Sequence, residues 1–347
     1  MMNLAKLARG GTTRAFAARG YVSIDGVRVP PREATVSFFD TSVQRGNGAF
    51  EVVRVLAGGR LRAPELHLER LARTAAAIEL PLPPRAALKS WLAEAAASQG
   101  GREGSVRLVA TRGGTSLPLL GGAGGGLGEE DAHWEQQEQE IAVPPRVAIA
   151  FERLPAWPAS MSLMPLCAPW HTAGADGWET AKWTSYGANI ASTRKAQGEG
   201  FDDALLLAPG ATYDGGGGGG GLGGAAAAGV VLDGPNFAVG WLRNGVFEAP
   251  GWAELGMLQS TSMTLALDAA ASLGVPVAEG SFTLEQASAA DEMVVLSSSR
   301  DLVPVAKLGV EGGGGGGGGG ATFDTGGELA AALRAAMVSD AVLSRYE

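Results

Sequence analysis

The stretch that decides the fold is AKWTSYGANIASTRKAQGEGFDDALLL, residues 181–207. Its first lysine, Lys182, follows an irregular segment rich in Trp and His and precedes a predicted helix over about 184–198. A predicted strand, DDALLLA (202–208), comes next. Burial in an apolar, aromatic pocket disfavours the ammonium form of a lysine and frees its amine for Schiff-base chemistry. From these residues alone, a structural or surface role for Lys182 remains the alternative.

Upstream of this stretch, short strands and helices follow one another. Apolar residues recur with helical spacing over 65–80, which predicts a helix, and a second helix is predicted over 85–98. The Asp25-Gly26 pair predicts a hairpin turn. The predicted strands are YVSIDGVRV (21–29), PREATVSFFD (31–40), AFEVVRVLAGGRL (49–61), SVRLVATRGG (105–114) and RVAIAFERL (146–154).

The prolines after Arg153 predict an interdomain linker over 154–169. Strands and helices on both sides of it indicate a two-domain α/β or α+β enzyme. We assign residues 1–20 to a basic tail, 21–153 to a smaller α/β domain and 170–347 to a larger domain. The elements predicted after residue 208 are strands at 230–234, 237–242, 245–250 and 292–297, and helices over about 257–274 and from about 328.

Composition excludes several classes of function. The 347 residues are 46% hydrophobic and 18% charged, as in globular proteins. A net charge of −9 argues against nucleic acid or an anionic membrane as the main partner. The single cysteine, Cys167, excludes a cysteine-based zinc cluster, and the three histidines are widely separated. No apolar run approaches the roughly 18 residues of a membrane span. We therefore expect no metal, no membrane and no nucleic acid.

Glycine is concentrated in three tracts, at 121–128, 215–229 and 312–320. Glycine has no side chain to bury, and loop-closure entropy grows slowly with length, so the tracts are expected to be surface-loop insertions. The first continues into an acid-rich stretch, which makes the insertion 121–142. None has the following Lys-Ser/Thr of a nucleotide-binding loop.

Residues 1–19 contain four basic residues and no acidic one. This composition is compatible with the end of an organellar transit peptide, and a plain basic tail is the alternative. We expect a soluble intracellular protein, in the cytoplasm or in a plastid or mitochondrion.

Six segments occur in this order: FFDTSVQRGNGAFEVVRV (38–55), HLERL (67–71), the stretch 181–207, VLDGPNFAVGWLRNGVFEAP (231–250), LGMLQSTSM (255–263) and ADEMVVLSSSRDLVPV (290–305). Together they resemble the class IV aminotransferases, the fold-type IV pyridoxal phosphate enzymes. The resemblance implies two domains, each a mixed sheet or barrel packed with helices, the cofactor pyridoxal 5′-phosphate, and a homodimer.

The resemblance assigns roles to individual residues. Lys182 matches the lysine that binds the cofactor covalently and moves the α-proton. Arg70 matches the arginine that binds the cofactor phosphate, for which a planar guanidinium is well suited. A solvated helix face, with Glu69 as partner, is the alternative for Arg70. Thr261 and Ser262 match the phosphate-binding start of a helix, and Ser298, in SSSRD, matches a further phosphate contact.

Asp233 matches the acid that faces the pyridine nitrogen and keeps the ring protonated. The family usually has glutamate there, and Asp214, in TYDGG, is a rival candidate. Two other departures are Met263, where many members have arginine, and Asn47, where aspartate is frequent. Candidates for binding substrate are Tyr186, Arg107 and Arg112.

The function implied by the resemblance is transfer of an amino group between an amino acid and a 2-oxo acid. Branched-chain or other apolar amino acids are the expected substrates. Two alternatives stay open: an aminodeoxychorismate lyase, which uses the same cofactor and releases pyruvate, and a non-catalytic protein of this fold that binds cofactor or a partner.

Overall fold

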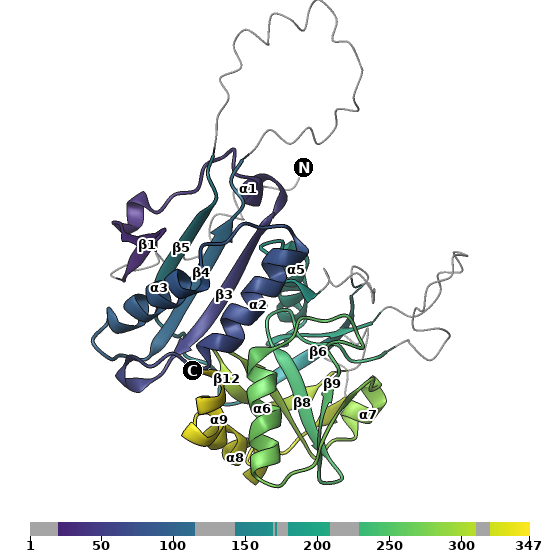
Figure 1. The fold of residues 1–347 in the computed structure, drawn as a ribbon. Coiled ribbons are helices and arrows are strands. Elements are labelled where there is room, and N and C mark those ends of the chain that lie inside the picture. The colour runs from purple at the N-terminus through teal and green to yellow at the C-terminus, as the bar shows by residue number, and fades with distance from the viewer. Residues whose placement is uncertain (1–19, 115–142, 169–170, 172–179, 209–228, 310–319) are drawn as a thin grey trace, which may run out of the picture.

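The structure is a computed structural model that describes residues 20–114, 143–168, 171, 180–208, 229–309 and 320–347 (Figure 1). The basic tail up to residue 19, the insertion 121–142 and Asp214 lie outside the described residues. So do the glycine tracts 215–229 and 312–320, apart from Gly229 and Gly320.

The N-terminal part forms a five-stranded antiparallel sheet in the order β2-β1-β5-β4-β3. Helices α2 and α3 cover one face of it (Figure 1) and bury Leu71, Leu88 and Leu92 against the strands. The predicted hairpin turn is confirmed, because Asp25 and Gly26 both have positive φ between β1 and β2. The bounds are β1 Val22–Ile24, β2 Val27–Arg28, α1 Thr41–Arg45, β3 Gly48–Val55, α2 Pro64–Ala77, α3 Arg85–Ala97, β4 Gly104–Thr111 and β5 Arg146–Glu152, with 3-10 helices at Pro31–Glu33 and Ala57–Gly59.

The C-terminal part forms a mixed eight-stranded sheet in the order β10-β9-β8-β11-β12-β6-β7, with β13 paired to β12. Helices α6, α8 and α9 pack on one face (Figure 1), where Leu265, Leu296 and Leu333 are buried. The bounds are β6 Met161–Cys167, α5 Gly187–Gly198, β7 Asp203–Leu207, β8 Ala238–Arg243, β9 Val246–Pro250, α6 Thr261–Ser272, β10 Val277–Gly280, α7 Leu284–Ser288, β11 Glu292–Ser297, β12 Asp301–Leu308, β13 Ala321–Thr322, α8 Glu328–Ala336 and α9 Asp340–Leu343, with a 3-10 helix at Ser344–Tyr346.

Two segments differ from the sequence expectation. Residues 161–167, expected within the linker, form β6 between β12 and β7. Pro165 is tolerated there because β6 pairs with β12 only through residues 161–163, so the missing N–H faces no second strand. Residues 31–40, expected to be a strand, contain a 3-10 helix and irregular chain. Pro30 and Pro31 lack the N–H donors that a strand needs at its start.

The segment containing Lys182 runs along the beginning of β3, between the two sheets. Ala49 and Trp183 form an antiparallel bridge. Phe50 donates its N–H to the carbonyl of Lys182 at 3.0 Å, and Thr184 donates its N–H to the carbonyl of Gly48 at 2.8 Å. The small sheet therefore fixes the lysine segment that leads into α5 of the large one.

No helix in the described ranges combines the length and the apolar character needed to cross a membrane.

Candidate active site

The Lys182 backbone is held from two sides. Its carbonyl accepts from Phe50 on β3, and its N–H donates to Thr74 Oγ1 on α2 at 2.9 Å. The helix expected from residue 184 begins only at Gly187, because Lys182 and Thr184 bond to β3 instead. The lysine thus stands on an extended segment whose direction two neighbouring elements determine.

The Lys182 side chain lies against aromatic rings. Its Nζ is 4.3 Å from the centroid of the Phe50 ring and donates to Tyr186 Oη at 3.2 Å. Phe50 and Tyr186 meet edge to face, with 5.0 Å between ring centroids. The amine is half-buried, and the two rings fix its direction.

Asp233 follows the bridge between Val231 and Leu207, and its carbonyl accepts from the Leu206 N–H at 2.8 Å. Burial raises the pKa of its carboxyl to about 7, although the positive charge of Lys182 opposes the rise. The two groups therefore share one electrostatic environment. Among the described residues, no side chain donates a hydrogen bond to this carboxylate, which interacts with Lys182 through charge and with its own backbone N–H.

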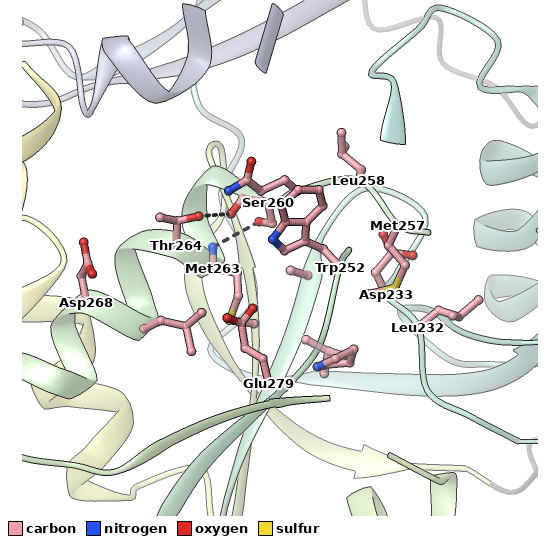
Figure 2. Close-up of a pocket in the computed structure, with 15 residues that line it drawn as sticks. Leu232, Asp233, Trp252, Met257, Leu258, Ser260, Met263, Thr264, Asp268 and Glu279 are labelled. Atoms are coloured by element: carbon pink, nitrogen blue, oxygen red, sulfur yellow. Dashed lines mark hydrogen bonds between the residues drawn. The ribbon is translucent and has the colours of Figure 1, made fainter. Parts of the chain in front are cut away.

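Figure 2 shows Asp233 beside Leu232 and Met257 at the wall of a cavity of about 240 Å³. Ser260, Met263 and Thr264 at the beginning of α6 lie across the cavity from it. Met263 is buried in the core between α6 and the sheet, so the position where the family often has arginine is apolar here.

The N-terminus of α6 presents free backbone donors. Ser260 caps the helix, because its Oγ accepts the Met263 N–H at 3.2 Å (Figure 2). Thr261 and Ser262 are the first two helical residues, whose N–H groups have no partner within the helix. These donors and the positive end of the helix dipole favour an anion.

Arg70 lies beside this helix end in a buried network. Its Nε and Nη2 donate to Glu51 at 2.8 and 2.7 Å, and its Nη1 donates to the Gln259 carbonyl at 2.8 Å. Burial alone raises the pKa of Glu51, but the charge and hydrogen bonds of Arg70, with those of His67, lower it to about 2. The partner of Arg70 is thus Glu51 rather than Glu69. A guanidinium has five N–H donors, so Arg70 keeps two for an anion.

Ser298 lies half-buried in the turn between β11 and β12. The next residue, Ser299, accepts at its carbonyl from Trp157 Nε1 at 2.9 Å and from Arg54 at 3.4 Å. Asp301, at the end of the turn, contacts Arg62, which also reaches Ser262 on α6. Arg62 therefore ties the turn of Ser298 to the α6 end.

Arg107 on β4 and Arg112, directly after β4, are the two arginine candidates for binding substrate, and they lie in different surroundings. The Arg107 guanidinium carbon is 5.9 Å from the Phe50 ring centroid, and its Nε donates to Glu152 at 2.7 Å. Arg112 instead donates to the carbonyls of Ile78 and Glu79 at the end of α2. Arg107 thus borders the ring beside Lys182, whereas Arg112 closes the end of a helix.

Three site residues were not singled out by sequence reasoning: Glu51, Arg62 and His67. Glu51 had a usable signal, because it shares the inward-facing positions of β3 with Ala49 and Val53, where a carboxylate needs a buried partner. Arg62 had none, since an arginine before a helix is ordinarily exposed.

The sequence profile described as "Amino-transferase class IV" matches residues 48–216 and 222–308. The chain belongs to the class IV aminotransferases. The match begins at β3, passes through Lys182 and Asp233, and ends with β12, so it includes every site residue described above.

Solved structures of similar fold include aminotransferases. A branched-chain aminotransferase of Thermoproteus uzoniensis with norvaline has a TM-score of 0.70 and 22% identity, over 94% of this chain and 96% of that one. A PLP-bound hypothetical aminotransferase of Mycobacterium tuberculosis has a TM-score of 0.70 and 19% identity, over 94% and 100% of the two chains.

One curated relative, "D-amino-acid transaminase, chloroplastic" of Arabidopsis thaliana, is 34% identical over 103 residues. That stretch is 29% of this chain and 27% of the relative, so the two proteins are similar over about a quarter of their lengths.

Class IV aminotransferases are pyridoxal phosphate enzymes. The residues present fit the group, because a phosphate needs N–H and O–H donors and positive charge. Thr261, Ser262 and the spare donors of Arg70 provide these around the α6 end. Lys182 offers the amine, and the Asp233 carboxylate is free to meet a ring nitrogen.

Proposed function

We propose that this class IV aminotransferase transfers an amino group between an apolar amino acid and a 2-oxo acid, with Lys182 as its catalytic residue. The observation that supports this most directly is the placement of the Lys182 amine. It lies against both the Phe50 and Tyr186 rings and within the electrostatic reach of Asp233.

When bound, pyridoxal phosphate supplies an electron-accepting ring that takes up the electrons left when the amino acid loses its α-proton. Lys182 Nζ carries that proton, and Tyr186 Oη, 3.2 Å away, orients the amine. Asp233 holds positive charge on the ring nitrogen, as it already interacts with the Lys182 cation.

The phosphate is bound, in this proposal, by Arg70, the α6 end with Thr261 and Ser262, and Ser298. Glu51 keeps Arg70 in place by two hydrogen bonds. Because the Glu51 carboxylate is ionised at neutral pH, the pair is neutral, and an arriving phosphate meets the helix dipole and the remaining guanidinium N–H groups.

We assign the substrate carboxylate to Arg107 and the side chain to the apolar surface of Phe50 and Tyr186. Arg107 lies beside the Phe50 ring and uses its Nε for Glu152, so its Nη groups can bind a carboxylate. The apolar rings favour an apolar substrate. The Thermoproteus structure was solved with norvaline, a straight-chain apolar amino acid, which agrees with an apolar substrate. The plant relative is named for D-amino acids, so both D- and L-forms are candidates.

A single-substrate experiment tests the proposal. Protein loaded with pyridoxal phosphate should lose its visible absorption band when leucine or valine is added without a 2-oxo acid, and regain it when 2-oxoglutarate is added. The reason is that a transferase stores the amino group on the cofactor between half-reactions. If the protein instead releases pyruvate from aminodeoxychorismate with no 2-oxo acid, it is a lyase. A band that no substrate alters, in D- or L-form, would indicate a non-catalytic binding protein.

We further propose a homodimer that uses the surface before α1. Phe38 is 71% exposed and Phe39 48% exposed, with 5.4 Å between their ring centroids, and Val36 and Val43 nearby in the chain are also exposed. Exposed aromatic clusters of this kind mark protein interaction surfaces.

Replacing both rings, Phe38→Ser with Phe39→Ser, should weaken the dimer at least about tenfold, since buried aromatic residues dominate interface energies. Sedimentation velocity over a concentration series measures the change. The matched control is Val277→Ser, which removes an exposed apolar side chain from β10 of the other sheet. A wild-type monomer that is fully active at micromolar concentration would contradict the proposal.

A further inference from the structure

Arg62 is a buried cation that the roles assigned so far do not use. Its side chain is 1% exposed. The residue lies in the segment between β3 and α2, where its N–H donates to the Arg54 carbonyl on β3 at 2.9 Å. The next residue, Ala63, is buried in the core of the large sheet with Met263 and Leu265. The packing of this segment therefore places the Arg62 guanidinium inside the large-sheet part.

Arg62 connects two segments that the proposed function assigns to the phosphate. One Nη donates to Ser262 Oγ, the second residue of α6, at 3.3 Å. The other pairs with the carboxylate of Asp301, which ends the turn containing Ser298. The Asp301 side chain is 22% exposed, and its negative charge compensates the buried positive charge of Arg62.

The bond to Ser262 also sets the direction of a hydroxyl proton. Ser262 Oγ accepts from Arg62, so its own O–H is left to donate elsewhere. The Thr261 hydroxyl, in contrast, is occupied by His67. Burial lowers the pKa of His67, so the ring is neutral, and its Nδ1–H donates to the ionised Glu51 at 2.7 Å. His67 Nε2 then accepts the Thr261 hydroxyl at 3.4 Å, which leaves Thr261 only its backbone N–H for an anion.

We propose that Arg62 is a positioning residue for the cofactor phosphate, acting through the Ser262 hydroxyl and through Asp301. This inference rests on the proposed function. Arg62 turns the Ser262 proton toward the phosphate, holds the Ser298 turn against α6, and neutralises a carboxylate that would repel a dianion. Its effect is therefore specific for the phosphate group and absent for the pyridine ring.

The comparison of pyridoxal phosphate with pyridoxal, which lacks the phosphate, tests this. Arg62→Met should weaken pyridoxal phosphate binding at least about tenfold, the usual effect of losing one charge-assisted hydrogen bond. Pyridoxal binding should change by no more than about twofold, since pyridoxal lacks the phosphate that Ser262 and the Ser298 turn would bind. Both constants are measured by absorbance titration, with borohydride trapping as a second readout. The matched control is Arg60→Met, two residues away, where the arginine is exposed and pairs with Asp340.

A second variant separates charge from packing. Asp301 has φ +66°, a conformation that asparagine tolerates as well as aspartate, so Asp301→Asn is compatible with the backbone. Adding Asp301→Asn to Arg62→Met removes the uncompensated carboxylate and should restore the part of the pyridoxal phosphate affinity that was lost through charge, but not the part lost through Ser262. If Arg62→Met does not fold, Arg62→Lys replaces it, since lysine keeps the charge and loses the two-pronged contact.

Equal weakening of both ligands, or no weakening of pyridoxal phosphate, would overturn the inference and leave the proposed function intact. Failure of Asp301→Asn to restore any affinity would also overturn it. A wild-type protein that binds neither ligand would overturn the proposed function, and the inference with it.

Discussion

Lys182→Ala should reduce transamination by about 10⁴-fold or more, because in the proposed function its amine both bonds to the cofactor and moves the α-proton. The amine is held by Tyr186 and the Phe50 ring, and none of the other lysines among the described residues has this setting. Steady-state rates with leucine and 2-oxoglutarate measure the loss.

Borohydride reduction gives an independent readout of the same residue. In the wild-type protein, reduction should fix the cofactor to the peptide that contains Lys182, and Lys182→Ala should lose this label. Lys195→Ala is the matched control, because Lys195 is exposed on α5, thirteen residues further along the chain. Label found on Lys89, Lys195 or Lys307 would refute the assignment.

Much of the fold follows from local signals. The Asp25-Gly26 hairpin and the strand at 292–297 are confirmed as predicted, because turn chemistry and a short apolar run determine them. The beginning of α5 and the strand β6 were not predictable in this way. Residues 182–184 extend because β3 offers hydrogen-bond partners, and β6 forms because β12 lies alongside it, some 140 residues later. Long-range pairing of this kind leaves no trace in a local pattern.

The candidate site, like the fold, could be predicted from the sequence only in part. The resemblance predicts Lys182, Arg70 and Asp233. In the structure, Asp233 lies within electrostatic reach of Lys182, and Arg70 lies beside the beginning of α6. The resemblance does not predict that Arg70 pairs with Glu51, nor that Arg62 reaches Ser262 across 200 positions of sequence. Arg70 meets Glu51 only when α2 packs on β3, and Arg62 meets Ser262 only when its segment packs on the large sheet.

Asp233 lends itself to a test by pH as well as by rate. Its carboxyl has a pKa of about 7 in the folded chain, against an ordinary value of 3.8. The folded state therefore binds more protons than the unfolded state between these values, and stability falls as pH rises from about 4 to about 7. In cofactor-free protein, Asp233→Asn should remove this part of the pH dependence. Melting temperatures of the two proteins across this range measure it, and parallel curves would show that the carboxyl does not titrate in this way.

The larger effect of Asp233→Asn is expected on the rate. In the proposed site, Arg70, Ser262 and the α6 end bind the phosphate independently of Asp233, so the variant should keep its cofactor. The rate should fall at least tenfold to a hundredfold, about what one buried charge-assisted hydrogen bond contributes, because a neutral amide does not hold the ring proton. Asp233→Glu, the family's usual residue, should keep the activity or raise it, and the cavity beside Asp233 has room for one more methylene. Asp214→Asn is the matched control and should be silent. If Asp214→Asn abolishes turnover and Asp233→Asn does not, the catalytic acid lies on the other side of the glycine tract.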